Sequence, residues 1–163
     1  MMRVGQGIDF HRFAENRKLI LGGIEIVYPL GLLGHSDADV LIHSLCDALL
    51  GALGLGDIGE HYNDEDPRWK DLDSKTILLD TLKRVEQREY TILNMDLTII
   101  GEEPRLSPYK EEIKDNLSKL CQLSKEAINI KATTTERMGA LGKKEGLAAL
   151  SIVLLARKGR QHD

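Results

Sequence analysis

Four leucines at four-residue spacing constrain the fold of this chain more than any other feature. They are Leu41, Leu45, Leu49 and Leu53, and side chains four residues apart lie on one face of an α-helix. The pattern predicts a helix from Ser36 to about Leu53. Glycines at 54, 56 and 59 end this helix and open a loop that runs to about residue 71.

A hairpin is predicted before this helix. The apolar runs 18–21 and 24–27 are separated by Gly22 and Gly23, which readily adopt the positive φ angles of a two-residue turn. Other strands are predicted at 4–10, 93–100, 127–132 and 146–157, and other helices at 74–89 and 107–121. We therefore expect a single α/β domain over residues 1–163, with a mixed sheet covered by helices on one face.

Composition narrows the class of partner. The net charge is -4, and the sequence has no basic stripe of the kind that binds nucleic acid. An aromatic content of 4% is too low for a surface that stacks many bases. No apolar run reaches the roughly 18 residues of a membrane span, no signal peptide is recognisable, and the two cysteines suggest no disulfide framework. We expect a cytoplasmic protein with no nucleic-acid or membrane partner.

Asp9, His11 and His43 are candidate metal ligands. Asp9 and His11 are two apart, so on an extended segment they point to the same side. With His43 from the following helix they would form a zinc site with three protein ligands and one open position, as catalytic sites often have. Asp47, one turn beyond His43, could accept the second ring proton of His43. The alternative is that His11 is a surface residue and His43 a half-buried one.

Two helix starts could bind phosphate. Ser36 is a natural N-cap, and the amides behind it, with His35 beside them, could meet a phosphate oxygen. Thr133 and Glu136 have capping-box spacing, which would explain this motif by itself. The threonine hydroxyls and free amides there could also cradle a phosphate, and Glu136 could hold Mg²⁺.

Two loops complete the set of candidate sites. The Gly- and acid-rich loop at 57–66 could hydrogen-bond sugar hydroxyls, although such loops are usually just solvated. The segment 101–107 could read a base edge through its backbone, with Arg105 on a phosphate, or could be a connector. Ser107 could cap the helix that follows, with Pro108 at its first position.

Four separated motifs together resemble the 2-C-methyl-D-erythritol 2,4-cyclodiphosphate synthase family. They are Gly5-x-Gly7-x-Asp9-x-His11, His35-Ser36-Asp37-x-Asp39-Val40-x-x-His43, Gly56-Asp57-Ile58-Gly59 and Lys131-Ala132-Thr133-Thr134-Thr135-Glu136. The resemblance runs through essentially the whole chain. It implies an enzyme of non-mevalonate isoprenoid synthesis, a phosphorus–oxygen lyase. In the family, the 2-phosphate of 4-diphosphocytidyl-2-C-methyl-D-erythritol 2-phosphate attacks the β-phosphorus and CMP leaves.

The resemblance also implies roles for particular residues. Asp9, His11 and His43 match ligands of Zn²⁺ or another divalent transition metal, and Glu136 matches the residue associated with Mg²⁺ or Mn²⁺ at the diphosphate. His35 and Thr134 match the positions that stabilise the transition state. Substrate contacts are implied for Asp9, His11, His35, Ser36, Asp57, Ile58, Gly59, Tyr62, Asp64, Asp66, Glu103, Pro104, Arg105, Leu106, Thr133, Thr134, Thr135, Glu136, Ala140 and Lys143. The family's homotrimer, with active sites between adjacent subunits, is implied as well.

The chain departs from the family pattern at several positions. Tyr62-Asn63 stands where Phe-Pro is common, and Arg105 where a lysine is usual. An aromatic residue is common at the position of Ala140, and arginine at that of Lys143. These two positions border a cavity on the trimer axis that holds isoprenoid diphosphates in the family, so the loss of a large apolar contact at Ala140 weakens that expectation.

Two other functions fit the same residues. One is a metal-dependent phosphohydrolase, in which water would be the nucleophile and oxygen-18 would enter the released phosphate. The other is a trimeric binding module for nucleotides or isoprenoid diphosphates, with a structural zinc ion. That module would need a fourth protein ligand on the metal.

Overall fold

The main sheet of the protein is mixed and has the strand order β4-β1-β7-β5-β6. The computed structural model describes residues 1–34, 36–62 and 72–159. The strands of this sheet are β1 (Met2–Ala14), β4 (Gly31–Leu32), β5 (Tyr90–Ile100), β6 (Ile128–Thr133) and β7 (Gly146–Arg157). β7 pairs antiparallel with both β1 and β5, whereas β5 and β6 are parallel.

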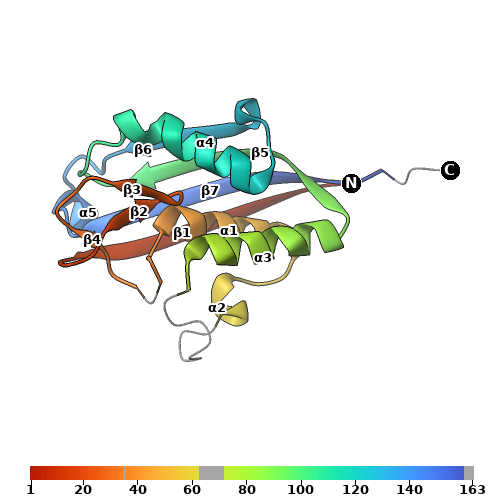
Figure 1. The fold of residues 1–163 in the computed structure, drawn as a ribbon, viewed down its shortest axis with the longest axis horizontal. Coiled ribbons are helices and arrows are strands. Elements are labelled where there is room, and N and C mark those ends of the chain that lie inside the picture. The colour runs from red at the N-terminus through yellow and green to blue at the C-terminus, as the bar shows by residue number, and fades with distance from the viewer. Residues whose placement is uncertain (35, 63–71, 160–163) are drawn as a thin grey trace.

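Three helices lie across one face of this sheet (Figure 1), namely α1 (Val40–Leu53), α3 (Ser74–Gln87) and α4 (Lys110–Cys121). Shorter elements are α2 (Ile58–His61), α5 (Gly139–Gly142) and 3-10 turns at Ser107–Tyr109 and Lys125–Ala127. The predicted class, α/β with a mixed sheet and helices on one face, is confirmed. Within the ranges that the structure describes, no helix is long and apolar enough to cross a membrane.

Helix α1 is the centre of the core. Leu41, Leu45 and Leu49 are fully buried, as their spacing predicted. The predicted start at Ser36 was wrong, because the helix begins at Val40 and its N-cap is Asp39, which accepts a hydrogen bond from the backbone N–H of Ile42. Its predicted end is confirmed, because Gly54 adopts the left-handed conformation with φ of 69°.

The predicted hairpin is also confirmed, although it stands outside the main sheet. Strands β2 (Leu19–Leu21) and β3 (Ile24–Ile26) form a two-stranded sheet of their own, joined by Gly22 and Gly23, both at positive φ. The carboxylate of Asp39 accepts the N–H groups of both glycines, at 2.9 and 2.6 Å. One buried carboxylate therefore caps α1 and fixes the hairpin against its start.

The predicted helix cap at Ser107 was wrong. Ser107 makes no side-chain cap: it opens a 3-10 turn together with Pro108, and α4 begins only at Lys110. Residues 133–138 were expected to open a short helix or a turn, and a turn is found there before α5. A capping signal is local, whereas the backbone N–H groups can find other partners in the folded chain.

The sheet face opposite the helices is open in the single chain. Side chains alternate along β1, so Gly5 and Gly7 face the helices whereas Val4, Ile8 and Phe10 face away. These three outward side chains are 68%, 50% and 64% exposed, and Ile152 of the neighbouring β7 is 43% exposed. The open face thus carries a contiguous group of large apolar side chains.

Candidate metal centre

Two glycines of β1 let helix α1 lie directly on the strand. A Cβ atom at Gly5 would stand 1.9 Å from the carbonyl oxygen of Ala48, and one at Gly7 would stand 1.9 Å from that of Ser44. Only hydrogen can occupy these positions. The close approach brings His43, on the first turns of α1, beside the side chains that follow the glycines on the same face of β1. The Gly-x-Gly-x-Asp-x-His motif therefore has a packing reason as well as a chemical one.

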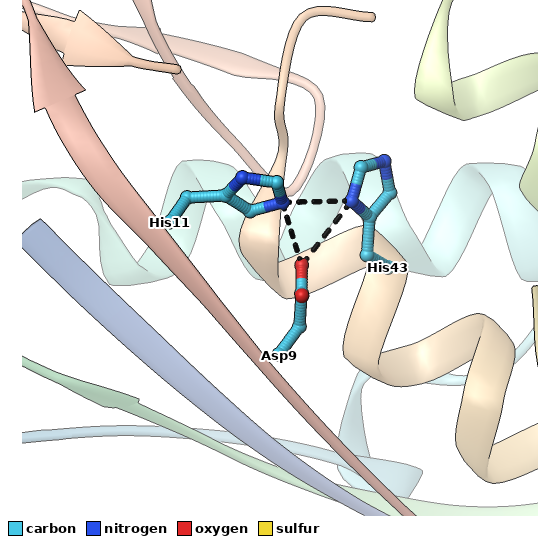
Figure 2. Close-up of side chains that lie close together, drawn as sticks. All are labelled: Asp9, His11 and His43. Atoms are coloured by element: carbon cyan, nitrogen blue, oxygen red, sulfur yellow. Dashed lines mark hydrogen bonds and ion pairs between the residues drawn. The ribbon is translucent and has the colours of Figure 1, made fainter. Parts of the chain in front are cut away.

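Asp9, His11 and His43 converge at this contact, as predicted (Figure 2). Asp9 Oδ2 lies 2.9 Å from His11 Nε2 and 3.2 Å from His43 Nδ1, and the two nitrogens are 3.2 Å apart. Donors bound at 2.0–2.1 Å to a tetrahedral ion stand roughly 3.3 Å from one another. The three donors therefore fit a zinc-sized ion with one further position for a water or substrate oxygen.

The electrostatics of the three residues suit a cation. Burial by itself would raise the pKa of Asp9, but hydrogen bonds and charge from His11 and His43 outweigh it and lower that pKa to about 2. Burial would lower the pKa of His11, yet the bond and charge of Asp9 raise it above its ordinary value. A positive charge is thus favoured where the three donors meet, and a divalent ion can supply it in place of protons.

Each histidine is held at its outer nitrogen. His11 Nδ1 lies 2.8 Å from the carbonyl oxygen of Leu33, which can only accept, so the proton of His11 sits on Nδ1 and Nε2 faces the centre. His43 Nε2 lies 2.9 Å from Ser74 Oγ, at the first residue of α3. Ser74 was missed in the sequence, because a single serine at a helix start has no spacing that links it to the metal ligands.

The prediction that Asp47 accepts the second ring proton of His43 was wrong. Asp47 does not reach the outer nitrogen; its Oδ1 accepts the backbone N–H of Ile58 at 2.8 Å. Asp57 in turn caps α2 through the N–H of Glu60. Asp47 therefore holds the 57–59 turn against α1. Four-residue spacing placed Asp47 on the correct face of the helix, one turn too far from the ring.

Ser36 lies beside the centre without being the cap of α1. Its Oγ is 3.4 Å from His43 Nε2 and 3.2 Å from Ser74 Oγ, and it accepts the N–H of Ala38. His35, Asp64 and Asp66 lie outside the described residues. Tyr62 is 8% exposed and donates its hydroxyl to Asp80, so this predicted contact residue is largely occupied within the chain.

The turn after β6 is built differently from the expected capping box. Glu102 Oε1 accepts the N–H groups of Thr135 and Arg137, at 3.1 and 3.0 Å, and the hydroxyl of Thr135. Glu136 N donates to Thr134 Oγ1. The amides at 135–137 are therefore already paired within the chain. The prediction that they are free to cradle a phosphate was wrong. Glu102 was missed because its partners lie 33–35 positions away.

The remaining predicted residues surround this turn. Thr133, Thr134 and Glu136 are exposed, and Glu136 has a positive φ of 53°. Glu103 accepts hydrogen bonds from Lys144 and from the hydroxyl of Tyr28. The other members show mixed exposure: Leu106 is 6% exposed, Pro104 is partly buried, and Arg105, Ala140 and Lys143 are exposed.

The metal centre and Thr133 lie on different strands of the sheet. Thr133 pairs with Ile100, Ile100 with Ala148, and Ala148 with Phe10, the neighbour of Asp9. Three strand spacings of about 4.8 Å separate Thr133 from Phe10 by roughly 14 Å. Thr133 thus lies at the same end of the sheet as the metal centre but three strands away. The turn after it reaches back toward β1, because Thr135 and Met138 line one cavity together with His11.

Comparison with known proteins gives consistent matches over the whole length. The model of the YgbB family matches residues 2–156. A relative from Geobacillus thermodenitrificans, "2-C-methyl-D-erythritol 2,4-cyclodiphosphate synthase", is 50% identical over 157 residues, which cover 96% of this chain and 98% of that protein. A protein of the same name from Leptospira borgpetersenii is 48% identical, with coverage of 96% and 99%.

Solved structures share the fold. The solved structure of "2C-Methyl-D-erythritol-2,4-cyclodiphosphate Synthase (bound form CDP)" has a TM-score of 0.87 and 39% identity, and the match covers 94% of this chain and 100% of that one. The bifunctional IspDF of Campylobacter jejuni has a TM-score of 0.91 and 43% identity, with coverage of 95% of this chain. The chain spans 42% of that longer protein.

Proposed function

The chain belongs to the YgbB family, and from this premise we propose that it forms 2-C-methyl-D-erythritol 2,4-cyclodiphosphate from 4-diphosphocytidyl-2-C-methyl-D-erythritol 2-phosphate, with release of CMP. It is a lyase of the non-mevalonate (MEP) pathway of isoprenoid synthesis. The observation that carries this function is the near-full-length identity to synthases of this name, together with the intact Asp9–His11–His43 centre.

The reaction needs no nucleophile from the protein. An oxygen of the substrate's 2-phosphate forms a bond to the β-phosphorus, and the bond from that phosphorus to the oxygen bridging to the α-phosphorus breaks. CMP leaves with the bridging oxygen and its charge. The protein therefore has two tasks: it holds the 2-phosphate in line with the breaking bond, and it stabilises the charge that develops on the phosphate oxygens.

Asp9, His11 and His43 would hold the divalent metal of this site, for which zinc is our assignment. Two neutral imidazoles and one carboxylate are ligands that suit zinc. When bound, zinc would supply Lewis acidity toward a phosphate oxygen of the substrate. Leu33 and Ser74 orient the two imidazoles from outside. The family role of Ser36 and of residues 57–59 is to contact the methylerythritol and its phosphates, and Ser36 lies within 3.4 Å of the His43 ring.

The second group of residues manages the diphosphate and the base. Thr134 would donate its hydroxyl to an oxygen whose charge grows in the transition state, the role assigned also to His35. Glu136 would hold Mg²⁺ or Mn²⁺ beside the diphosphate; its carboxylate is exposed at the turn. Residues 103–106 would contact the cytidine, for which Leu106 has only its backbone available because its side chain is in the core.

A homotrimer would join the two groups. In one chain Thr133 is three strands away from the metal centre, and the turn of a neighbouring subunit could lie opposite each metal centre instead. The open apolar face of β1 and β7 is the surface that such a neighbour could cover. We also place the protein in the cytoplasm, where its two free cysteines, Cys46 and Cys121, would stay reduced.

Product analysis of the metal-loaded protein tests this function. Purified protein with Zn²⁺ and Mg²⁺ is incubated with the substrate in water enriched in oxygen-18, and the products are identified by mass spectrometry. We expect CMP and the cyclic diphosphate in equal amounts, both without oxygen-18. Open-chain products that carry oxygen-18 would instead identify a phosphohydrolase, and no turnover by folded, metal-loaded protein would overturn the proposal.

A further inference from the structure

Behind the metal centre, the outer nitrogen of His43 meets a directed chain of polar groups. His43 Nε2 lies 2.9 Å from Ser74 Oγ, and Ser74 donates its own hydrogen bond to Asp37 Oδ1. Ser74 is fully buried. A hydroxyl that has given its one proton to a carboxylate has only lone pairs left. Toward His43, Ser74 can therefore act only as an acceptor.

The inner nitrogen of the same ring faces a competing acceptor. His43 Nδ1 lies 3.2 Å from the carboxylate oxygen of Asp9. A neutral imidazole has a single proton to place. A proton on Nδ1 would bond to Asp9 and block the lone pair that a metal needs. A proton on Nε2 would bond to Ser74 and leave the lone pair of Nδ1 open.

We infer that Ser74, with Asp37 behind it, is a positioning residue that draws the proton of His43 to Nε2 and keeps Nδ1 open for the metal. The inference rests on the metal centre of the proposed function. Ser36 is a weaker candidate for the same role, because its Oγ is 3.4 Å from Nε2. His11 reaches the same result through the backbone carbonyl of Leu33, which no substitution can remove.

The expected cost of losing this chain is a drop in metal affinity. Partners that orient a metal-binding histidine from outside are typically worth 10- to 100-fold in affinity. Ser74→Ala should therefore raise the dissociation constant for Zn²⁺ by about 10- to 100-fold. Asp37→Asn keeps the shape and an oxygen acceptor but removes the charge that holds the hydroxyl proton of Ser74, so its effect should be smaller and of the same sign.

Zinc competition against a chelator of known affinity measures this effect at pH 8. Thr81→Val is the matched control, because Thr81 is a fully buried hydroxyl of the same helix that donates to Ile77 within α3 and does not contact the metal centre. We expect the control to bind zinc as the unaltered protein does. If Ser74→Ala does not give a cooperative thermal unfolding transition, Asp37→Asn decides the question.

The position of the proton gives a readout independent of affinity. Nitrogen-15 NMR of histidine-labelled, metal-free protein at pH 8 distinguishes the two tautomers. We expect the His43 proton on Nε2 in the unaltered protein and in Thr81→Val. In Ser74→Ala, we expect a shift of the population toward Nδ1, where Asp9 accepts it.

Two results would overturn the inference. Unchanged zinc affinity in folded Ser74→Ala and Asp37→Asn would do so while leaving the metal centre intact, as would a proton on Nδ1 in the unaltered protein. Failure of the unaltered protein to bind zinc would have a different meaning: it would remove the proposed metal centre itself, and the role of Ser74 with it.

Discussion

The metal centre and the 133–137 turn are the two halves of the proposed active site, and they are built in opposite ways. Asp9, His11 and His43 are partly or largely buried, and their donors already stand 2.9–3.2 Å apart. The turn is exposed, and a single carboxylate, that of Glu102, holds its backbone. One half is complete within a chain, whereas the other presents its threonines and Glu136 outward.

This difference separates two ways of losing activity. Damage to the metal centre should remove a bound ion together with the activity. Damage to the turn should leave the ion bound and lower turnover alone, because the turn acts on substrate from another place on the sheet. Each of the following changes tests that separation.

The largest effect is expected from His43→Ala. It removes one of three metal ligands, and metal assistance to phosphoryl transfer is worth several kcal/mol, so activity should fall by about 1,000-fold or more. Zinc content by elemental analysis and turnover should fall together. His61→Ala is the control for zinc content alone, because His61 bonds the carbonyl oxygen of Leu55 and is not one of the three donors. A zinc-free His43→Ala protein with full activity would refute the assignment.

Gly7→Ala should break the centre through the backbone. Its Cβ would stand 1.9 Å from the carbonyl oxygen of Ser44, so α1 must move away from β1 and take His43 with it. Overpacking of this kind costs about 1–3 kcal/mol of unfolding free energy, measurable by urea denaturation, and zinc affinity should fall as well. Gly159→Ala, which meets no atom within 4 Å, should change neither. Equal stability of Gly7→Ala and the unaltered protein would contradict the packing argument.

Glu102→Gln tests the other half. It preserves an oxygen acceptor but removes the charge that strengthens three hydrogen bonds to Thr135 and Arg137. If the weaker hydrogen bonds raise the activation free energy by about 1 kcal/mol, kcat should fall roughly fivefold. Zinc affinity should not change. The control is Glu89→Gln, which should change neither kcat nor zinc affinity, because Glu89 precedes β5 at the end of the sheet opposite the turn and accepts a hydrogen bond from Arg157. A parallel loss of zinc would show that the two halves are not separable.

The last test changes the pH and leaves the sequence unaltered. Metal ligands must be deprotonated, and Asp9 raises the pKa of His11 in the metal-free protein. Protons should therefore begin to compete with zinc at a higher pH than for an ordinary histidine, and below that raised pKa the affinity should fall by about tenfold per pH unit. Zinc titrations between pH 8 and 6 check this. An affinity that rises as pH falls would contradict the sign.

Local patterns in the sequence predicted the elements better than their ends. The leucine spacing placed α1, and Gly22-Gly23 placed the hairpin, because both signals act through neighbouring residues. Ser36, Ser107 and Thr133 were all expected to cap helices, and none does. A cap depends on which backbone N–H groups remain unpaired after folding. Asp39 caps α1 from the position directly before the helix, whereas Glu102 binds the N–H of Thr135 from 33 positions away.

The sequence by itself determined the donors. Asp9 and His11 face the same side because a strand alternates, and His43 follows a helix start that places it near them. Only the tertiary structure decided what completes the site: the glycine contact that lowers α1 onto β1, the choice of Ser74 over Asp47 as the partner of His43, and the separation of Thr133 from the metal centre by three strands. Spacing along a chain specifies directions within one element, whereas distances between elements depend on how those elements pack.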